Sequence, residues 1–225
     1  MGCPGAGKGT QAARIAELLN VAHVSTGDIF RQHIEQGTEL GLKVKACIDE
    51  GHLAPDELAC EIVVSRLTED DCKNGYILDG FPRSGGQAQC LETLLKERGE
   101  HLDIVINLTV PDDEIVDRLT ARRMCPKCGE IYNVRYNPPK NGVGCDHPEC
   151  DNAPLMQRQD DQEDTIRERL RVYHFVSEPI RSFYEERGLL VDVCASGVTP
   201  DALFDTIECL ITTHGASPAE STTEL

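Results

Sequence analysis

Residues 2–11 read Gly-Cys-Pro-Gly-Ala-Gly-Lys-Gly-Thr-Gln, so two glycines with four residues between them, Gly2 and Gly7, are followed directly by a lysine. Glycines let backbone N–H groups converge on an anion, and the lysine adds a mobile positive charge. A helix that begins near Gly9 would direct its positive dipole end to the same place. The segment therefore predicts a loop that binds the phosphates of a nucleoside triphosphate. Its binding residues would be Gly5, Ala6, Gly7, Lys8, Gly9 and Thr10.

A carboxylate further along the chain can complete a metal site beside this loop. Asp79 follows a short apolar segment, 75–78, and precedes Gly-Phe-Pro-Arg. A carboxylate at the end of a strand can order the water shell of Mg²⁺ next to the β- and γ-phosphates. Alone, Asp79 could equally be a turn residue. Together with the phosphate loop, it predicts Mg²⁺ binding through Thr10 and Asp79.

Four of the eleven cysteines lie in one segment, 124–157, that is rich in Gly, Pro and Asn. Their spacing is that of a closed four-thiolate zinc site, formed by Cys125, Cys128, Cys145 and Cys150. Four protein ligands leave no open position for chemistry, so the metal would be structural. The last gap is longer than the commoner two residues, which makes His147 a rival to Cys150; we favour Cys150. The residues do not distinguish zinc from iron.

The elements that position these residues alternate along the chain. Apolar spacing and capping residues predict helices over about 9–20, 25–36, 40–50, 55–69, 86–98, 111–123, 161–187 and 199–213. Apolar runs predict strands over 21–24, 75–78, 103–110 and 189–193. Strands that alternate with helices predict an α/β fold with a parallel sheet covered on both faces.

Composition limits the partners. The 225 residues carry a formal net charge of −17, and this field opposes binding to nucleic acid. No stretch approaches the ~18 apolar residues of a membrane span, and no secretory signal precedes the loop. Eleven cysteines without a secretory signal favour a reducing, cytoplasmic location over a disulfide framework. Local clusters of arginine in such an acidic chain are candidate sites for binding an anion.

Five motifs in one order give the chain a family resemblance. They are Gly-x-Pro-Gly-Ala-Gly-Lys-Gly-Thr-Gln (2–11), Ser-Thr-Gly-Asp (25–28), Leu-Asp-Gly-Phe-Pro-Arg (78–83), Asp-Arg-x3-Arg-Arg (117–123) and Arg-x-Asp-Asp-x-Glu (158–163). Over residues 2 to about 213 the chain resembles adenylate kinases of the long-lid type. The resemblance implies a three-layer P-loop core (1–24, 55–121, 160–214), a helical monophosphate-binding insert (25–54), a zinc-ribbon-like lid (122–159) and a disordered tail (215–225).

The same resemblance implies the reaction ATP + AMP ⇌ 2 ADP with Mg²⁺, carried out by a monomer. It assigns catalysis to Lys8, Arg83, Arg122, Arg158 and Arg169. It adds Arg118, Arg122, Ile131, Tyr132 and Thr199 to the ATP site. It places AMP against Thr26, Arg31, His52, Leu53, Ala54, Gly80, Phe81, Pro82, Arg83, Gln87, Arg158 and Arg169, with Gln87 reading the base. Asp160 and Asp161 would lie at the base of the lid, as general bases or only as partners of arginines.

Two alternatives stay open. Another nucleoside monophosphate kinase would use UMP, CMP or GTP as one substrate. A non-catalytic protein that binds nucleotide and zinc is the second alternative, because only Met1 precedes the loop where the family has a buried central strand. Loss of that strand would cost several kcal/mol, about the stability margin of an ordinary domain. Since the motifs are retained, we expect a native start further upstream and an active enzyme.

Overall fold

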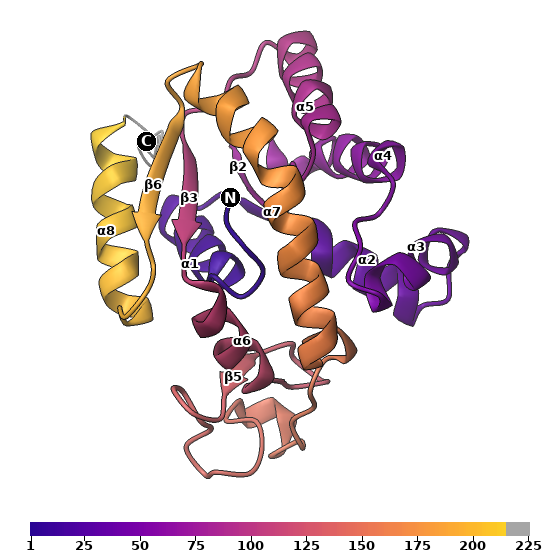
Figure 1. Cartoon of the computed structure of the whole chain (residues 1–225), viewed down its shortest axis with the longest axis vertical. Coiled ribbons are helices and arrows are strands. Elements are labelled where there is room, and N and C mark those ends of the chain that lie inside the picture. Colours follow the sequence, from indigo (N-terminus) through magenta and orange to yellow (C-terminus); the bar gives the residue numbers. More distant parts are fainter. Residues whose placement is uncertain (215–225) are drawn as a thin grey trace, which may run out of the picture.

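The structure is a computed structural model that describes residues 1–214; the predicted disordered tail, 215–225, lies outside them. Its α-helices are α1 (Lys8–Leu19), α2 (Thr26–Glu35), α3 (Glu39–Asp49), α4 (Asp56–Leu67), α5 (Gly85–Arg98), α6 (Asp112–Thr120), α7 (Glu163–Glu185) and α8 (Pro200–Thr213). Its strands are β1 (Ala22–Ser25), β2 (Tyr76–Asp79), β3 (Val105–Thr109), β4 (Arg122–Met124), β5 (Ile131–Asn133) and β6 (Leu190–Cys194) (Figure 1). Short 3-10 turns are η1 (Asp70–Cys72), η2 (Pro148–Cys150) and η3 (Gln159–Asp161).

Local side-chain hydrogen bonds explain where several helices begin. Ser25, Thr38, Ser84 and Thr199 each accept a hydrogen bond from the backbone N–H three residues later. Such caps satisfy N–H groups that have no partner inside the helix. Helix α1 begins differently, after Gly7 in a left-handed conformation with φ of 96°. The predicted order of helices and strands is confirmed for the core.

The core strands form two parallel pairs, as the alternating pattern predicted. Strand β1 pairs with β2 from Ala22 opposite Tyr76, and β3 pairs with β6 from Val105 opposite Leu190. Within residues 1–214 no strand joins the two pairs into one sheet. The hydrophobic core follows the same division, since one cluster surrounds β3 and β6 and another surrounds β1 and β2.

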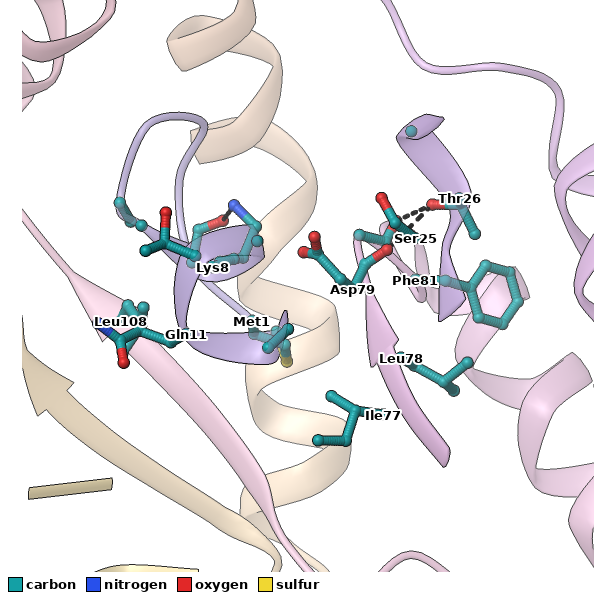
Figure 2. A pocket seen from close by; sticks show the side chains of 18 of the residues that line it. Met1, Lys8, Gln11, Ser25, Thr26, Ile77, Leu78, Asp79, Phe81 and Leu108 are labelled. Carbon is teal, nitrogen blue, oxygen red and sulfur yellow. Dashed lines mark hydrogen bonds between the residues drawn. The ribbon is translucent and has the colours of Figure 1, made fainter. Parts of the chain in front are cut away.

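The first residues of the chain lie along β3. Gly2 forms a parallel bridge with Leu108, and the Leu108 N–H donates to the Met1 carbonyl at 3.0 Å. The Met1 ammonium donates to the Ile106 carbonyl. Figure 2 shows Met1 between β3 and β2, where a cavity is lined by Met1, Ile77, Val105, Ile106, Ile180 and Tyr184. Met1 and Gly2 thus occupy only one end of the space in which a central strand was expected.

The helix prediction over 111–123 was wrong at its end. Helix α6 stops at Thr120, and Arg122–Met124 forms β4, which pairs antiparallel with β5. The last carbonyls of α6 are satisfied from β5 instead of from a further helical turn. Asn133 donates to the Arg118 carbonyl at 3.0 Å, and Val134 donates to the Ala121 carbonyl at 2.9 Å. No helix in residues 1–214 has the length and apolar character needed to cross a membrane.

Candidate nucleotide-binding site

The phosphate loop closes around its own lysine. Lys8 Nζ donates to the carbonyls of Gly2 and Cys3 at 2.7 and 2.8 Å, and the Ala6 N–H donates to the Cys3 carbonyl at 3.2 Å. Burial lowers the pKa of Lys8 to about 8, although the charge of Asp79 opposes the shift. A buried ammonium whose partners are two neutral carbonyls is ready to bind an anion. Figure 2 shows this amine turned back onto the loop.

Asp79 lies beside the first turn of α1, where the sequence placed a magnesium site. A Cβ atom on Gly9 would lie 3.1 Å from Asp79 Oδ2, and His23 Nε2 lies 3.7 Å from the same oxygen. Burial raises the pKa of the Asp79 carboxyl, but the neighbouring His23 ring and the charge of Lys8 outweigh it and hold the pKa below its usual range. Asp79 therefore offers an ionised carboxylate at this position. With the Thr10 hydroxyl it forms a donor set that fits Mg²⁺, which prefers carboxylate and water oxygens.

Five of the arginines that line the same cavity, of about 2050 Å³, come from separate segments. They are Arg31, Arg83, Arg122, Arg158 and Arg169. Burial lowers the pKa of Arg158 to about 10, and the positive charges of Arg31 and Arg122 add to the effect. Arg158 Nε is buried without a hydrogen-bond partner among the described residues. Buried guanidinium groups that destabilise one another indicate a site for a polyanion.

Two carboxylates at the base of the lid neutralise part of this charge. Asp161 pairs with Arg122 at 2.6 Å, and Asp160 pairs with Arg169 at 2.9 Å. Asp161 has no exposed area. Both carboxylates pair with arginines in this structure, and whether either also acts as a general base stays a prediction. The remaining cationic capacity of the cavity is carried by Lys8, Arg83 and Arg158.

The side of the cavity around Thr26, Arg31 and Gln87, where the sequence predicted the monophosphate, is held by hydrogen bonds to the backbone and to two acidic residues. Thr26 Oγ1 donates to the Gly80 carbonyl at 3.0 Å, and Arg31 pairs with Asp28. Gln87, which is 2% exposed, donates to Asp56 Oδ1 at 2.8 Å. Sequence reasoning missed both acidic partners. Asp28 lies in the 25–28 motif and Asp56 in the first turn of a helix, a position that also suits a simple interaction with the helix dipole.

The other residues predicted for the triphosphate site lie at the same cavity. Arg118 donates to the Ala195 carbonyl at 2.6 Å and pairs with Glu114. The contact with Ala195 holds the 195–199 loop against α6. Thr199 caps α8 with its side chain. Tyr132 lies in the core of the lid, where its hydroxyl accepts from the Asp146 N–H at 2.7 Å. All predicted nucleotide-site residues line the cavity, and their individual roles stay predictions.

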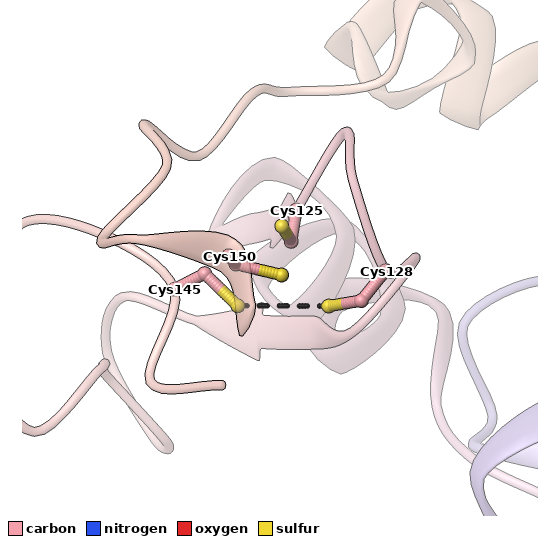
Figure 3. A group of neighbouring side chains, drawn as sticks. All are labelled: Cys125, Cys128, Cys145 and Cys150. Carbon is pink, nitrogen blue, oxygen red and sulfur yellow. Dashed lines mark hydrogen bonds between the residues drawn. The ribbon is translucent and has the colours of Figure 1, made fainter. Parts of the chain in front are cut away.

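The four lid cysteines converge on one point (Figure 3). Their sulfur atoms all lie within 4.8 Å of one another, and the cysteines come from the segments 125–128 and 145–150. Burial raises the pKa of Cys125, but backbone N–H groups of Cys128 and Lys127 outweigh it and bring the pKa to about 6. The rival ligand His147 instead turns its ring to its own loop, where Nδ1 accepts from Glu149 N–H at 3.4 Å. The cluster is compatible with zinc bound by four thiolates.

A glycine loop before α1, a carboxylate at the end of the parallel strand β2 and several arginines around the same cavity define a P-loop protein that binds nucleoside phosphates. A family model described as adenylate kinase matches residues 1–189. Adenylate kinases of Oceanobacillus iheyensis and Acetivibrio thermocellus are each 51% identical to this chain over 193 residues, which is 86% of this chain and 88% of theirs. The adenylate kinase of Archaeoglobus fulgidus is 48% identical with the same coverage. The chain belongs to the adenylate kinase family, whose members are nucleoside monophosphate kinases.

Proposed function

We propose that this chain catalyses ATP + AMP ⇌ 2 ADP, and that ATP binds on the phosphate loop while AMP binds on the Gln87 side. The observation that carries the proposal is the convergence of Lys8 and five arginines from separate segments on one cavity. Transfer of a phosphoryl group between two polyanions needs charge neutralisation and in-line positioning, with little covalent chemistry for the protein. A cationic cavity with a subsite at each end meets that need.

The site residues divide between the two nucleotides. The backbone N–H groups of the loop from Gly5 to Thr10 hold the ATP phosphates, and Lys8 leaves its two carbonyl partners to reach them. Arg83, Arg122, Arg158 and Arg169 neutralise the transferring phosphoryl group. The ATP subsite is completed by Arg118, Ile131, Tyr132 and Thr199. The AMP subsite is formed by Thr26, Arg31, His52, Leu53, Ala54, Gly80, Phe81, Pro82, Arg83, Gln87, Arg158 and Arg169.

Two metals support the reaction in different ways. Thr10 and Asp79 would hold Mg²⁺, which neutralises the phosphate charge when it is bound. Zinc in the Cys125, Cys128, Cys145 and Cys150 cluster would be structural, because all four positions are taken by protein thiolates. The lid core contains only five buried residues, so a metal would supply much of its stability. Eleven free cysteines suit a reducing compartment such as the cytoplasm.

The two flanking segments would exclude water from the transfer. We assign 25–54 to AMP binding and 122–159 to the lid, and the remainder of 1–214 to the core. Closure of both segments over the cavity would keep water from accepting the phosphoryl group. The ion pair of Arg169 with Asp160 lies at the base of the lid, so closure would carry these groups towards the bound phosphates.

ADP formation from ATP and AMP, measured beside UMP, CMP and GTP in place of one substrate, tests the proposal. We expect the highest kcat/KM with ATP and AMP, and a loss of about 10²–10³-fold in Arg83→Met. Arg187→Met is the control, since Arg187 lies outside the cavity and pairs with Glu92. Preference for another monophosphate would favour a different nucleoside monophosphate kinase. Nucleotide binding without turnover would favour the non-catalytic alternative.

A further inference from the structure

Gln87, the residue assigned to the AMP base, is held by a carboxylate that does not line the cavity. Its Nε2 donates to Asp56 Oδ1 at 2.8 Å, and its Oε1 accepts from the Arg83 backbone N–H at 2.7 Å. Asp56 Oδ2 accepts from Ser84 Oγ at 2.6 Å, and that hydroxyl also caps α5. Asp56 therefore joins the first turns of α4 and α5 around the side chain of Gln87.

These contacts determine which way the Gln87 amide faces. A carboxylate only accepts hydrogen bonds and a backbone N–H only donates them, so the amide has one orientation that satisfies both neighbours. Rotating it by half a turn would set its oxygen against the Asp56 carboxylate and its NH₂ group against the Arg83 N–H. Gln87 is 2% exposed, so water could not replace the hydrogen bonds that its own amide would lose, whereas the carboxylate of Asp56 lies on an exposed residue. The orientation of the amide is thus fixed, with Nε2 on the Asp56 side and Oε1 on the Arg83 side.

One N–H hydrogen on Nε2 and one lone pair on Oε1 remain for a ligand. An adjacent donor and acceptor match the 6-amino group and ring N1 of adenine, which present a donor beside an acceptor. A 6-oxopurine presents the reverse pattern, an acceptor beside an N1–H donor. We propose that Asp56 is the positioning residue that makes the monophosphate site select 6-aminopurines over 6-oxopurines, by fixing the orientation of the Gln87 amide. This inference rests on the proposed assignment of Gln87 to the AMP base.

The test compares the affinities for AMP and inosine monophosphate, which differ only in this hydrogen-bonding pattern. Titration calorimetry on the full chain measures both without requiring turnover. In Asp56→Asn the new side chain can present either NH₂ or oxygen to Gln87, so the constraint from the carboxylate is lost while size is kept, and only the Arg83 N–H still orients the amide. We expect the ratio of the two affinities to fall by about tenfold, within the range that one well-placed amide contact contributes. Affinity for inosine monophosphate should rise as affinity for AMP falls.

Glu57→Gln is the matched control, because it removes the same charge from an exposed side chain one residue further along α4. Its affinity ratio should equal that of the unchanged protein. Asp56→Ser provides a second variant if Asp56→Asn does not fold. The serine hydroxyl both donates and accepts, and serine suits the start of a helix. A folded Asp56 variant that keeps the original ratio would overturn the inference.

The outcomes also separate this inference from the proposed function. An unchanged protein that binds AMP with a strong preference over inosine monophosphate, but does not form ADP, contradicts the proposed activity and leaves the ratio test intact. An unchanged protein that does not distinguish the two nucleotides overturns the role of Asp56 even if it forms ADP. Failure to bind either nucleotide overturns both.

Discussion

Arg122 and Asp161 form a two-point ion pair at the place where the lid leaves the core. The guanidinium donates from Nε and Nη2 to the two carboxylate oxygens, at 2.8 and 2.6 Å. Arg122 begins β4 and Asp161 ends η3, so the pair ties the first residue of the lid to the core segment that directly follows the lid. The carboxylate has no exposed area and the arginine side chain is 18% exposed. The pair therefore holds both ends of the lid beside the cavity.

Breaking this pair from one side should be costly, because it leaves a partly buried arginine without its counter-charge. We expect Asp161→Asn to lower the free energy of unfolding by about 3–5 kcal/mol, measured by urea denaturation. Glu163→Gln is the control, since it removes a carboxylate two residues away from a pair with Arg167 whose members are both more than half exposed. That surface pair should contribute less than about 1 kcal/mol. Similar losses in the two variants would contradict a special role for the Arg122 pair.

The lid cluster leads to a prediction about metal. We expect one zinc ion per chain by elemental analysis, and a lower melting temperature after treatment with a chelator. Cys150→Ser should abolish stoichiometric zinc, because three thiolates leave the tetrahedral site incomplete. His147→Ala should retain it, because the His147 ring faces its own loop. Zinc lost from the His147 variant and kept in the Cys150 variant would reverse the ligand assignment.

The buried lysine leads to a pH prediction. The pKa of Lys8 is lowered to about 8, so in the free chain its ammonium loses a proton as the pH rises through 8. Bound triphosphate favours the charged ammonium and raises that pKa. ATP affinity should therefore fall as the pH rises above about 8, and binding there should take up a proton. Calorimetry at pH 8.5 in buffers with different ionisation enthalpies measures the uptake.

Lys8→Arg is the control for this titration, because a guanidinium stays charged throughout the range. Its ATP affinity can be weaker overall, since the longer side chain fits the loop less well. Its pH dependence above 8 should nevertheless be flat, with no proton uptake. A variant that keeps the slope of the unchanged protein would assign the titration to another group.

The space between β2 and β3 leads to a prediction about stability. We expect a short apolar strand fused in front of Met1 to continue the pairing that Gly2 begins with Leu108, and to fill the cavity beside Ile77 and Ile106. The gain should be several kcal/mol in the free energy of unfolding, since each buried aliphatic side chain contributes about 1.5–3 kcal/mol. A Gly/Ser extension of the same length is the control, because it provides backbone without apolar side chains. Equal stability of the two extended chains would contradict the prediction.

The same extensions remove a buried terminal amine. Burial lowers the pKa of the Met1 ammonium from 8.0 to about 5. Between these values the unfolded chain binds more protons than the folded one, so the stability of the chain that begins at Met1 should rise as the pH increases from 5 to 8. Both extensions should reduce this slope, since neither leaves an amine at the position of Met1. Urea denaturation at pH 5.5 and pH 8 compares the slopes.

Much of the site could be read from short segments. The loop 2–11, the motif around Asp79 and the cysteine spacing each lie within a few residues, where local geometry links sequence to chemistry. The helix caps at Ser25 and Thr199 were visible for the same reason. The end of α6 was predicted wrongly because β5 satisfies its last carbonyls, and that contact involves Asn133, which is fifteen residues from Arg118.

The sequence by itself determined the class of fold, the order of its elements and a set of residues that line one cavity, because residue type and spacing express them directly. Only the tertiary structure decided which charges are neutralised, such as Arg122 by Asp161, 39 residues away. It also decided that Asp56 orients Gln87, 31 residues away, and that Met1 lies against β3 across a separation of 105 residues. Such contacts depend on how whole elements pack together, and spacing along the chain carries no information about them.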